Sequence, residues 1–187
     1  MRIYFAAPLF STAECEFNRL LAEALRRHGH EIFLPQEHEQ RTDRPDLIFK
    51  SDREGIDWAQ MVLANLDGSD PDSGTCWELG YGYGVNKCIM VYRTDFRLFE
   101  GADKVNLMMT ESANHVIYAP KMGVEELAER IDQEIRNRFE PVRYRAPMKA
   151  DQFGGFDRDP RGPEDKFADS IKEAAGIPVR RYRHGDK

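Results

Sequence analysis

Two carboxylic acids, Asp72 and Glu78, lie six residues apart, with Gly74 in the turn between them. Glu78 stands in the apolar and aromatic segment CWEL at 76–79, where an ionised carboxylate is costly unless it is paired or reactive. Paired carboxylates beside aromatic rings suit glycosidic chemistry, because one can attack an anomeric carbon while the other handles a proton or holds the sugar. Asp and Glu are also common in turns and at helix N-termini, so a purely structural role stays open.

Two aromatic residues near the N-terminus could take part in such chemistry. Tyr4 could place its phenol where the hydroxyl hydrogen-bonds and orients a catalytic carboxylate, and Phe10 could stack on a planar base. Both residues also fit a hydrophobic core, and for Phe10 a core position is the simpler interpretation.

Motifs of other active sites are missing from the sequence. The first predicted strand is followed by AAPLF at 6–10 in place of the G-x-G-x-x-G of dinucleotide-binding folds, and there is no P-loop and no G-x-S-x-G elbow. The histidines form no H-E-x-x-H pair and the cysteines no C-x-x-C pair. We therefore expect neither a cofactor nor a metal.

Composition limits the class of partner. The chain has 187 residues, of which 41% are hydrophobic and 32% charged, with a net charge of −6, and these values predict one soluble globular domain. No run approaches the roughly 18 apolar residues of a membrane-spanning helix, and the N-terminal apolar run is too short for a signal peptide, so we expect a cytoplasmic protein without a membrane partner. The acidic balance argues against nucleic-acid binding, which relies on clustered Lys and Arg.

The candidate residues need a scaffold that brings distant segments together, and the hydrophobic pattern predicts one. Strands are predicted at 2–7, 31–34, 61–66, 88–92 and 115–118, alternating with helices after Ser11 and at 46–60, 75–85 and 124–139. Such alternation predicts a parallel α/β sheet covered by helices on both faces. The ligand crevice of these sheets lies beyond the carboxyl ends of the strands, so the loops after the first and third strands are expected to hold the site.

Local patterns add two predictions about the helices. Ser11 and Glu14 have the spacing of a capping box, and the helix that they open is expected to bury a face that includes Leu20. Glycine at every second position over 80–84 weakens the third helix, which predicts close packing of its backbone against a neighbour or a ligand.

The composition changes beyond Phe139, where Gly-Gly, Asp-Pro and Gly-Pro pairs occur among many charges. We therefore expect a core domain of residues 1–139 and a C-terminal extension of residues 140–187 that packs on the domain or on a neighbouring subunit. A further helix is predicted at 164–175, and the basic end at 180–184 is interpreted as a solvated tail or a strap between subunits.

Four segments, taken in order, resemble the nucleoside 2-deoxyribosyltransferase family. They are IYFAAPLF at 3–10, the stretch 52–68 that ends in Asp-Gly, DSGTCWELGY at 72–81, and VNLM at 105–108. The match extends over residues 2–138. The resemblance implies a doubly wound, flavodoxin-like or Rossmann-like fold with five parallel strands, and a homo-oligomer whose active sites are shared between subunits.

The resemblance also implies roles for the candidate residues. Glu78 would be the nucleophile that attacks C1′ of a 2′-deoxyribonucleoside, and Tyr4 would be the phenol that orients it. Asp52 would contact the base and help to protonate its leaving nitrogen. Asp72 would bind the deoxyribose hydroxyls, with Gly74 beside it in the turn.

Four further positions complete the expected substrate site. Asn106 and Met108 would come from a neighbouring subunit and close over the sugar near its 5′-hydroxyl. Gln36, in the loop after the second strand, is expected to contact the base, and Phe10 to stack on it. AAP at 6–8 replaces the Gly-rich first loop of some members, which leaves the preference between purine and pyrimidine open.

The leading hypothesis is a pentosyltransferase that moves 2-deoxyribose between nucleobases through a covalent glycosyl-enzyme, with hydrolysis when water replaces the second base. Its partners would be 2′-deoxynucleosides, free nucleobases and further copies of the chain. A second hypothesis is an N-glycoside hydrolase of deoxynucleosides or their 5′-phosphates. A third is a non-catalytic nucleotide-binding module, in which Asp72 and Glu78 only cap and hydrogen-bond.

Overall fold

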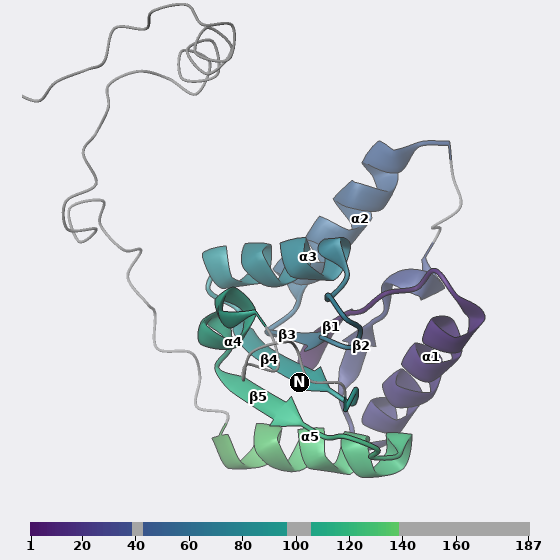
Figure 1. The fold of residues 1–187 in the computed structure, drawn as a ribbon. Helices are drawn as coiled ribbons and strands as arrows, with labels where there is room; N and C mark the ends of the chain where they lie inside the picture. The colour runs from purple at the N-terminus through teal and green to yellow at the C-terminus, as the bar shows by residue number, and fades with distance from the viewer. Residues whose placement is uncertain (39–42, 97–105, 139–187) are drawn as a thin grey trace, which may run out of the picture. The chain divides into compact units, whose positions relative to one another are not determined.

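A computed structural model describes residues 1–38, 43–96 and 106–138 of the chain (Figure 1). All of them belong to one compact unit, Met1–Arg145. The predicted extension of residues 140–187, with its expected helix and basic end, lies outside the described residues. Among the described helices, none combines the length and the apolar character needed to cross a membrane.

The strands form one parallel sheet. They are β1 (Arg2–Ala6), β2 (Glu31–Phe33), β3 (Met61–Asn65), β4 (Cys88–Arg93) and β5 (His115–Tyr118), and every neighbouring pair is parallel. The strand order is β2-β1-β3-β4-β5, which is the flavodoxin-like order. This confirms the predicted five-stranded parallel α/β fold. In this order the chain changes direction across the sheet between β1 and β3, so the crevice is expected at their carboxyl ends.

Helices cover both faces of the sheet (Figure 1). One face packs against α1 (Thr12–Arg27) and α5 (Val124–Arg138), through a core that includes Ile3, Phe5 and Leu63. The other face packs against α2, α3 and α4 through a core that includes Tyr4, Val62 and Leu79. Their bounds are Pro45–Trp58, Ser73–Gly84 and Leu107–Ser112, and a 3₁₀ turn, η1, covers Pro35–Glu37.

Alternation along β1 decides which side chains can reach the candidate site. Successive residues of a strand point to opposite faces of the sheet. Ile3 and Phe5 therefore belong to the core under α1 and α5, whereas Tyr4 points to the face covered by α2 and α3. Glu78 lies on α3, so the strand pattern places Tyr4 and Glu78 on the same side of the sheet.

The N-terminus of α1 forms as predicted, but its buried face differs in one position. The capping box is present, because the Ser11 hydroxyl accepts from Glu14 N while the Glu14 carboxylate accepts from Ser11 N. The prediction for Leu20 was wrong, since this residue is 38% exposed. Asn18 is buried instead, and its amide donates to the carbonyl oxygen of Pro8 at 2.8 Å, which ties the helix to the loop after β1.

The glycines of α3 do not share one role. A Cβ at Gly82 would lie 2.7 Å from the Val62 Cγ2, so this glycine lets the helix approach β3 closely. A Cβ built at Gly80 or Gly84 meets no atom within 4 Å outside the adjoining backbone of the helix, so the prediction of close packing against a neighbouring element was wrong for these two positions, while packing against a ligand stays a prediction. The sequence pattern also missed the short helix α4 and the turn η1.

Candidate active site

A cavity of about 490 Å³ opens on the α2 and α3 side of the sheet, beyond the carboxyl ends of β1, β2 and β3. Six of the ten described lining residues are small or apolar, and the other four have polar side chains. The described lining residues are Ala7, Leu9, Phe10, Pro35, Ile48, Asp52, Asp72, Gly74, Thr75 and Glu78. A cavity of this size is within the range of small-molecule sites.

Each wall follows from the topology. The loop after β1 supplies residues 7–10, and the turn after β2 supplies Pro35. Ile48 and Asp52 are four residues apart on α2, so both lie on the face of that helix turned to the cavity. The N-terminal part of α3 brings Asp72 and Glu78. The site therefore lies at the predicted carboxyl edge of the sheet.

A hydrogen bond joins Tyr4 on β1 to Glu78 on α3. The Tyr4 hydroxyl donates to Glu78 Oε1 at 2.6 Å, across 74 positions of sequence. Tyr4 is fully buried, and its ring stacks on Phe33 with centroids 5.4 Å apart. The phenol is thus held in place by the sheet, and it directs one oxygen of the carboxyl group.

The surroundings of Glu78 favour its neutral form. Burial raises its pKa to about 8, the hydrogen bond from Tyr4 lowers it, and the charges of Asp52 and Asp72 raise it. Burial also raises the pKa of Tyr4 far above its usual value, and the negative charges of Glu78 and Asp52 add to that shift. Tyr4 therefore remains a hydrogen-bond donor, while Glu78 titrates near neutral pH and is able to exist in both protonation states there.

Asp72 combines a cavity position with a structural contact. It is the N-cap of α3, and its Oδ2 accepts from Thr75 N at 2.9 Å and lies 3.3 Å from the Thr75 hydroxyl. A Cβ at Gly74 would lie 3.0 Å from the same oxygen, so a larger residue there would crowd the carboxylate. The helix cap fixes the direction in which Asp72 meets the cavity.

Asp52 and Phe10 occupy different depths of the site. Asp52 is partly buried on α2 and acts through its charge on both Tyr4 and Glu78. Phe10 is 79% exposed, so the simpler interpretation of this residue as part of the core was wrong. Its ring belongs to the loop after β1 and lies at the rim of the cavity.

Gln36 turns toward α1. Its side-chain amide donates to the carbonyl oxygen of Cys15 at 2.8 Å, and its Oε1 accepts from Asn18 Nδ2 at 3.2 Å. The neighbouring Pro35 lines the cavity, whereas Gln36 is not among the described lining residues. In this structure Gln36 holds the turn after β2 against α1.

Asn106 and Met108 lie on α4, outside the described lining of the cavity. Asn106 caps that helix, with its side-chain oxygen accepting from Met108 N at 2.9 Å. The Met108 side chain is 72% exposed. Helix α4 meets α3 through a contact of 3.7 Å between Cys76 Sγ and Met109 Sδ. The chain therefore does not bring Asn106 and Met108 into its own cavity.

The aromatic neighbours of Glu78 in the sequence do not form the walls around it. Trp77 is 45% exposed, stacks on Tyr81 with centroids 5.3 Å apart, and also contacts Phe49. The ring that meets Glu78 belongs to Tyr4, far away in sequence. Consecutive helix residues point about 100° apart, which explains why the residues beside Glu78 face elsewhere.

Sequence reasoning missed several residues that shape the site. Thr75 is 1% exposed, lines the cavity and holds Asp72, and its position three residues after an Asp N-cap was the available signal. Phe33, which supports Tyr4, and Ile48, which lines the wall, carried no sequence signal for these roles. Among the described residues, no group of three or more His, Cys, Asp or Glu is placed to hold a metal ion.

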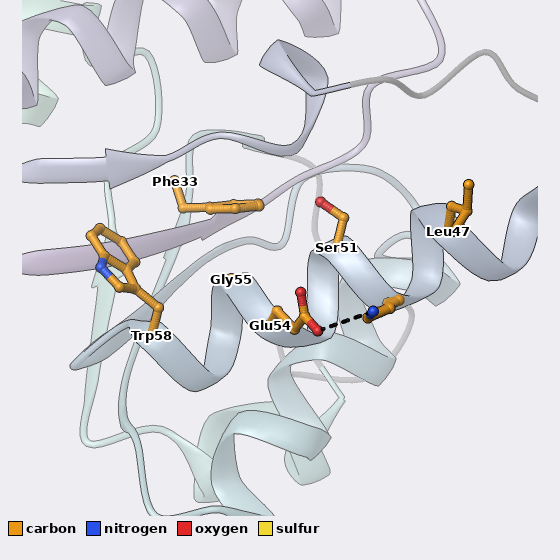
Figure 2. Close-up of a pocket in the computed structure, with 7 residues that line it drawn as sticks. Phe33, Leu47, Ser51, Glu54, Gly55 and Trp58 are labelled. Atoms are coloured by element: carbon orange, nitrogen blue, oxygen red, sulfur yellow. Dashed lines mark ion pairs between the residues drawn. The ribbon is translucent and has the colours of Figure 1, made fainter.

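A second hollow of about 440 Å³ lies on another side of α2 (Figure 2). In Figure 2 the Phe33 ring lies over the helix at Gly55, with Trp58 and Ser51 to either side. A Cβ at Gly55 would lie 2.7 Å from that ring, so glycine is needed for this contact. Lys50 and Glu54 in this hollow are 3.8 Å apart and exposed. The hollow shares α2 with the active-site cavity but holds no counterpart of the Tyr4 and Glu78 pair.

Comparisons with known proteins agree with this arrangement. A family model described as nucleoside 2-deoxyribosyltransferase matches residues 3–153. A solved 2-deoxyribosyltransferase from the psychrotolerant bacterium Bacillus psychrosaccharolyticus is 27% identical, with a TM-score of 0.55, and the match covers 68% of this chain and 90% of the other. A conserved protein from Enterococcus faecalis V583 is 26% identical, with a TM-score of 0.59 and coverage of 73% and 98%.

A more distant structure shares the fold. It is a CMP N-glycosidase from Clostridium botulinum, 21% identical, with a TM-score of 0.50 and coverage of 71% of this chain and 99% of the other. No curated protein sequence matches the chain.

Proposed function

The chain belongs to the nucleoside 2-deoxyribosyltransferase family, and we propose that it transfers 2-deoxyribose between nucleobases through a covalent ester on Glu78. The observation that carries this proposal is the 2.6 Å hydrogen bond from the buried Tyr4 hydroxyl to Glu78, at a cavity that also holds Asp52 and Asp72. Tyr4 fixes one oxygen of the carboxyl group, which leaves the other to attack C1′.

In the first half-reaction an oxygen of the ionised Glu78 forms a bond to C1′ while the bond from C1′ to the base nitrogen breaks. The electron pair of the broken bond stays on the base, which takes a proton, and Asp52 is the side chain that we assign to this proton. A 2-deoxy sugar lacks the electron-withdrawing 2-hydroxyl, so its oxocarbenium-like transition state forms more easily and one carboxylate suffices to capture it.

In the second half-reaction a new base attacks C1′ from the side that the first base left. The ester bond from C1′ to Glu78 breaks, and the proton lost by the ring nitrogen of the incoming base returns to Asp52. Two inversions restore the β configuration and free Glu78, with ping-pong kinetics. Water in place of the second base would release free 2-deoxyribose. The two activities thus share one intermediate, and access of water to the cavity decides between them.

The remaining site residues are assigned to binding. Asp72 would accept hydrogen bonds from the sugar hydroxyls, since its direction is set by the α3 cap and by the space left at Gly74. Phe10, exposed at the rim, would cover the base. Asn106 and Met108 would reach the sugar of a neighbouring copy in a homo-oligomer, which is supported by their position outside their own cavity and by the exposure of Met108.

The charge of the cavity favours nucleosides over nucleotides as substrates. Three of the described lining residues carry carboxyl groups, and none of those described is Lys or Arg. A 5′-phosphate needs Arg, Lys or clustered amides, and it would be repelled by nearby carboxylates. This observation favours the nucleoside transferase over the nucleotide hydrolase.

A base-exchange assay tests the proposal. Thymidine and adenine are incubated with the protein, and liquid chromatography is used to detect deoxyadenosine, thymine and free 2-deoxyribose. We expect deoxyadenosine and thymine in equal amounts, and thymidine 5′-phosphate should be a much poorer donor than thymidine. Free 2-deoxyribose as the only sugar product would overturn the transferase in favour of a hydrolase.

Mass spectrometry tests the nucleophile. A 2′-fluorinated nucleoside slows the breakdown of the intermediate, so the intact protein should gain the mass of the fluorinated sugar, and peptide mapping should place it on Glu78. A Glu78→Ala variant should show no adduct, while Glu54→Ala, in the neighbouring hollow, should still form one. Full exchange activity in Glu78→Ala would rule out the covalent mechanism.

A further inference from the structure

Two loops form much of the wall that a bound base would meet. Under the proposed function Glu78 attacks C1′ and Asp72 holds the sugar hydroxyls, and both residues belong to the α3 side of the cavity. The base then lies against the remaining walls. These walls are α2 and the loops after β1 and β2, which contribute Ala7, Leu9, Phe10 and Pro35.

Side chains of α1 hold the backbone of the loop after β1. Three consecutive loop residues are each bound by a different side chain of the first two turns of the helix. These contacts are Asn18 Nδ2 to the Pro8 carbonyl oxygen at 2.8 Å, Cys15 Sγ to the Leu9 carbonyl oxygen at 3.2 Å, and Phe10 N to Glu14 Oε2 at 3.0 Å. The loop backbone is therefore fixed, although the Phe10 side chain is 79% exposed.

Asn18 also joins this loop to the turn after β2. An Asn side chain carries two N–H donors, and Nδ2 of Asn18 contacts Gln36 Oε1 at 3.2 Å as well as the loop after β1. Gln36 donates in turn to the carbonyl oxygen of Cys15 at 2.8 Å. Pro35, the neighbour of Gln36, lines the cavity. One buried amide thus sets the spacing between the two loops.

Asn18 stands where an apolar residue would serve the helix better. It is 2% exposed and shares the buried face of α1 with Leu21 and Leu25. Burial of an amide costs free energy unless its hydrogen bonds are made, and Asn favours a helix less than Leu does. Neither Asn18 nor Gln36 is among the described lining residues of the cavity. The contribution of Asn18 therefore lies in the two loops that it joins.

Resting on the proposed function, we propose that Asn18 and Gln36 are positioning residues that set how well a nucleobase competes with water for the sugar on Glu78. They act by holding the two loops at the separation at which a base fits between the loops and α2. A base must occupy this space before it attacks C1′, whereas water needs only a path to C1′. Loss of the contact between Asn18 and Gln36 should therefore weaken transfer and spare hydrolysis.

The two competing reactions begin from the same ester. In transfer a ring nitrogen of the base forms a bond to C1′, and in hydrolysis the oxygen of water does so. In both, the ester bond from C1′ to Glu78 breaks, its electron pair returns to the carboxylate, and the attacking group loses one proton, which Asp52 takes up. The chemistry on the protein is thus shared, and only the transfer reaction depends on the loops.

The experiment compares Asn18→Leu, Gln36→Met and the double variant with the wild type. Both substitutions keep a side chain of similar size and remove the amide. Arg19→Met is the matched control on the same helix, because the described hydrogen bonds of Arg19 go to Glu16 and Glu23 of α1 and not to a loop. Thermal melts give the folded fraction of each variant.

The ester is formed with the 2′-fluorinated nucleoside and freed of the released base by gel filtration. Its decay is then followed by mass spectrometry of the intact protein, first in buffer and then with increasing adenine. The decay in buffer measures hydrolysis. The dependence on adenine gives the concentration at which transfer is half-maximal, and liquid chromatography identifies the fluorinated deoxyadenosine that forms.

Asn18→Leu should raise the half-saturating adenine concentration about tenfold or more, because two hydrogen bonds that hold the loops are lost. Decay in buffer should not slow by more than about twofold, and it should quicken if the loosened loops admit water. Arg19→Met should match the wild type in both measurements. A residue that acted only on the stability of the fold would change both reactions alike.

The double variant tests whether Gln36 acts through Asn18. If the two residues form one connection, breaking it a second time costs little more, so the half-saturating adenine concentration of the double variant should lie within about threefold of that of Asn18→Leu. If Gln36 contacted the base directly, the losses of the two single variants would multiply. Multiplied losses would therefore overturn the joint role of Asn18 and Gln36.

Two further results would overturn the inference while leaving the proposed function intact. One is an unchanged adenine dependence in Asn18→Leu, and the other is an equal loss of the adenine and water reactions in that variant. A wild-type protein that forms no ester, or whose ester reacts only with water, would overturn the proposed transferase, and this inference with it.

Discussion

Buried or partly buried carboxylates occur at two ends of the sheet, and their surroundings differ. At the carboxyl ends of the strands, Glu78 is held by a neutral phenol and faces two further carboxyl groups. At the opposite end, Asp132 and Glu134 of α5 are held by cationic groups and histidines. Figure 1 shows α5 under the face of the sheet opposite to α2 and α3.

Asp132 illustrates the second kind of surroundings. Its Oδ2 accepts from Arg136 Nε at 2.7 Å, and its Oδ1 lies 3.0 Å from His30 Nε2, across 102 positions of sequence. His28 Nδ1 lies 3.5 Å from Asp132 Oδ2. Burial alone would raise the pKa of Asp132, but the hydrogen bond and charge of Arg136 and the contact with His30 bring it below its usual value.

Glu134, on the same helix, also has arginine and histidine partners. It lies within 2.8 Å of Arg130, 2.7 Å of Arg138 and 3.3 Å of His115, with its side chain 8% exposed. Partners of opposite charge stabilise the ionised form and make a carboxylate structural. The contrast between Glu78 and Asp132 teaches that the neighbouring groups decide whether desolvation leaves the pKa of a carboxyl group raised or lowered.

The largest expected effect is a loss of base exchange, which is tested by making the same change from Glu to Gln at each end of the sheet. Glu78→Gln should reduce base exchange by about four orders of magnitude or more, because an amide cannot serve as the nucleophile. Glu134→Gln is the matched control and should keep kcat per folded molecule. Exchange rates measured at equal folded concentration check this. Similar losses of base exchange in Glu78→Gln and Glu134→Gln would contradict a difference in function between the carboxylates at the two ends of the sheet.

Removal of the phenol should have the next largest effect. Tyr4→Phe deletes the hydrogen bond to Glu78, and bonds to ionised groups contribute about 1.5–3 kcal/mol, so kcat/KM should fall about 10- to 100-fold. Because this bond lowers the pKa of Glu78, its loss should move the rising limb of the pH profile of kcat/KM to higher pH. A profile that stays in place would show that Tyr4 does not act through Glu78.

At the α5 end the expected effect is on stability. Glu134→Gln leaves Arg130, Arg138 and His115 without their charged partner, and both arginines are more than half exposed, at 52% and 64%. Solvent screening limits the loss, which we place at about 1–2 kcal/mol in the free energy of unfolding. Denaturant titration measures this value. A variant as stable as the wild type would show that these ion pairs are not structural.

The smallest expected effect is a gain in the stability of the Glu78→Gln variant relative to wild type, and the sign of this difference depends on pH. Glu78 has a pKa of about 8 in the folded protein, above its value in the unfolded chain. As pH rises between these two values the unfolded chain releases the proton first, so the wild type loses stability up to about pH 8.

Glu78→Gln does not ionise and escapes this loss. Its melting temperature relative to wild type should therefore be higher at pH 8 than at pH 5. Differential scanning calorimetry at both pH values gives the comparison. If the melting temperature of Glu78→Gln relative to wild type were higher at pH 5 than at pH 8, this result would contradict the raised pKa of Glu78.

Much of the fold could be predicted from local pattern. The capping box at Ser11 and the alternation of strands and helices depend on residues close in sequence, and both are present. Helix α4 was missed because its six residues, Leu107–Ser112, are too few for a helical period to be recognised. Leu20 was misplaced because the buried face of α1 is centred on Asn18, Leu21 and Leu25, and Leu20 lies at its edge.

The residue types of the site and its place at the carboxyl edge of the sheet could be predicted, but the directions of its side chains could not. The spacing around Glu78 indicated a reactive carboxylate, yet Trp77, its aromatic neighbour, packs on Tyr81 instead of on the cavity. Gln36 occupies the expected loop, but its amide bonds to α1. The direction of a side chain depends on contacts with distant segments, so position in a loop does not determine it.

The sequence by itself determined the order of strands and helices, the cap of α1 and the presence of carboxylates after β3, because these depend on propensities and spacing along the chain. Only the tertiary structure decided which groups would surround each carboxyl group. Tyr4 reaches Glu78 across 74 positions, and His30 reaches Asp132 across 102. Ionisation depends on the charges and dipoles within a few ångströms of a group, and those neighbours are set by folding.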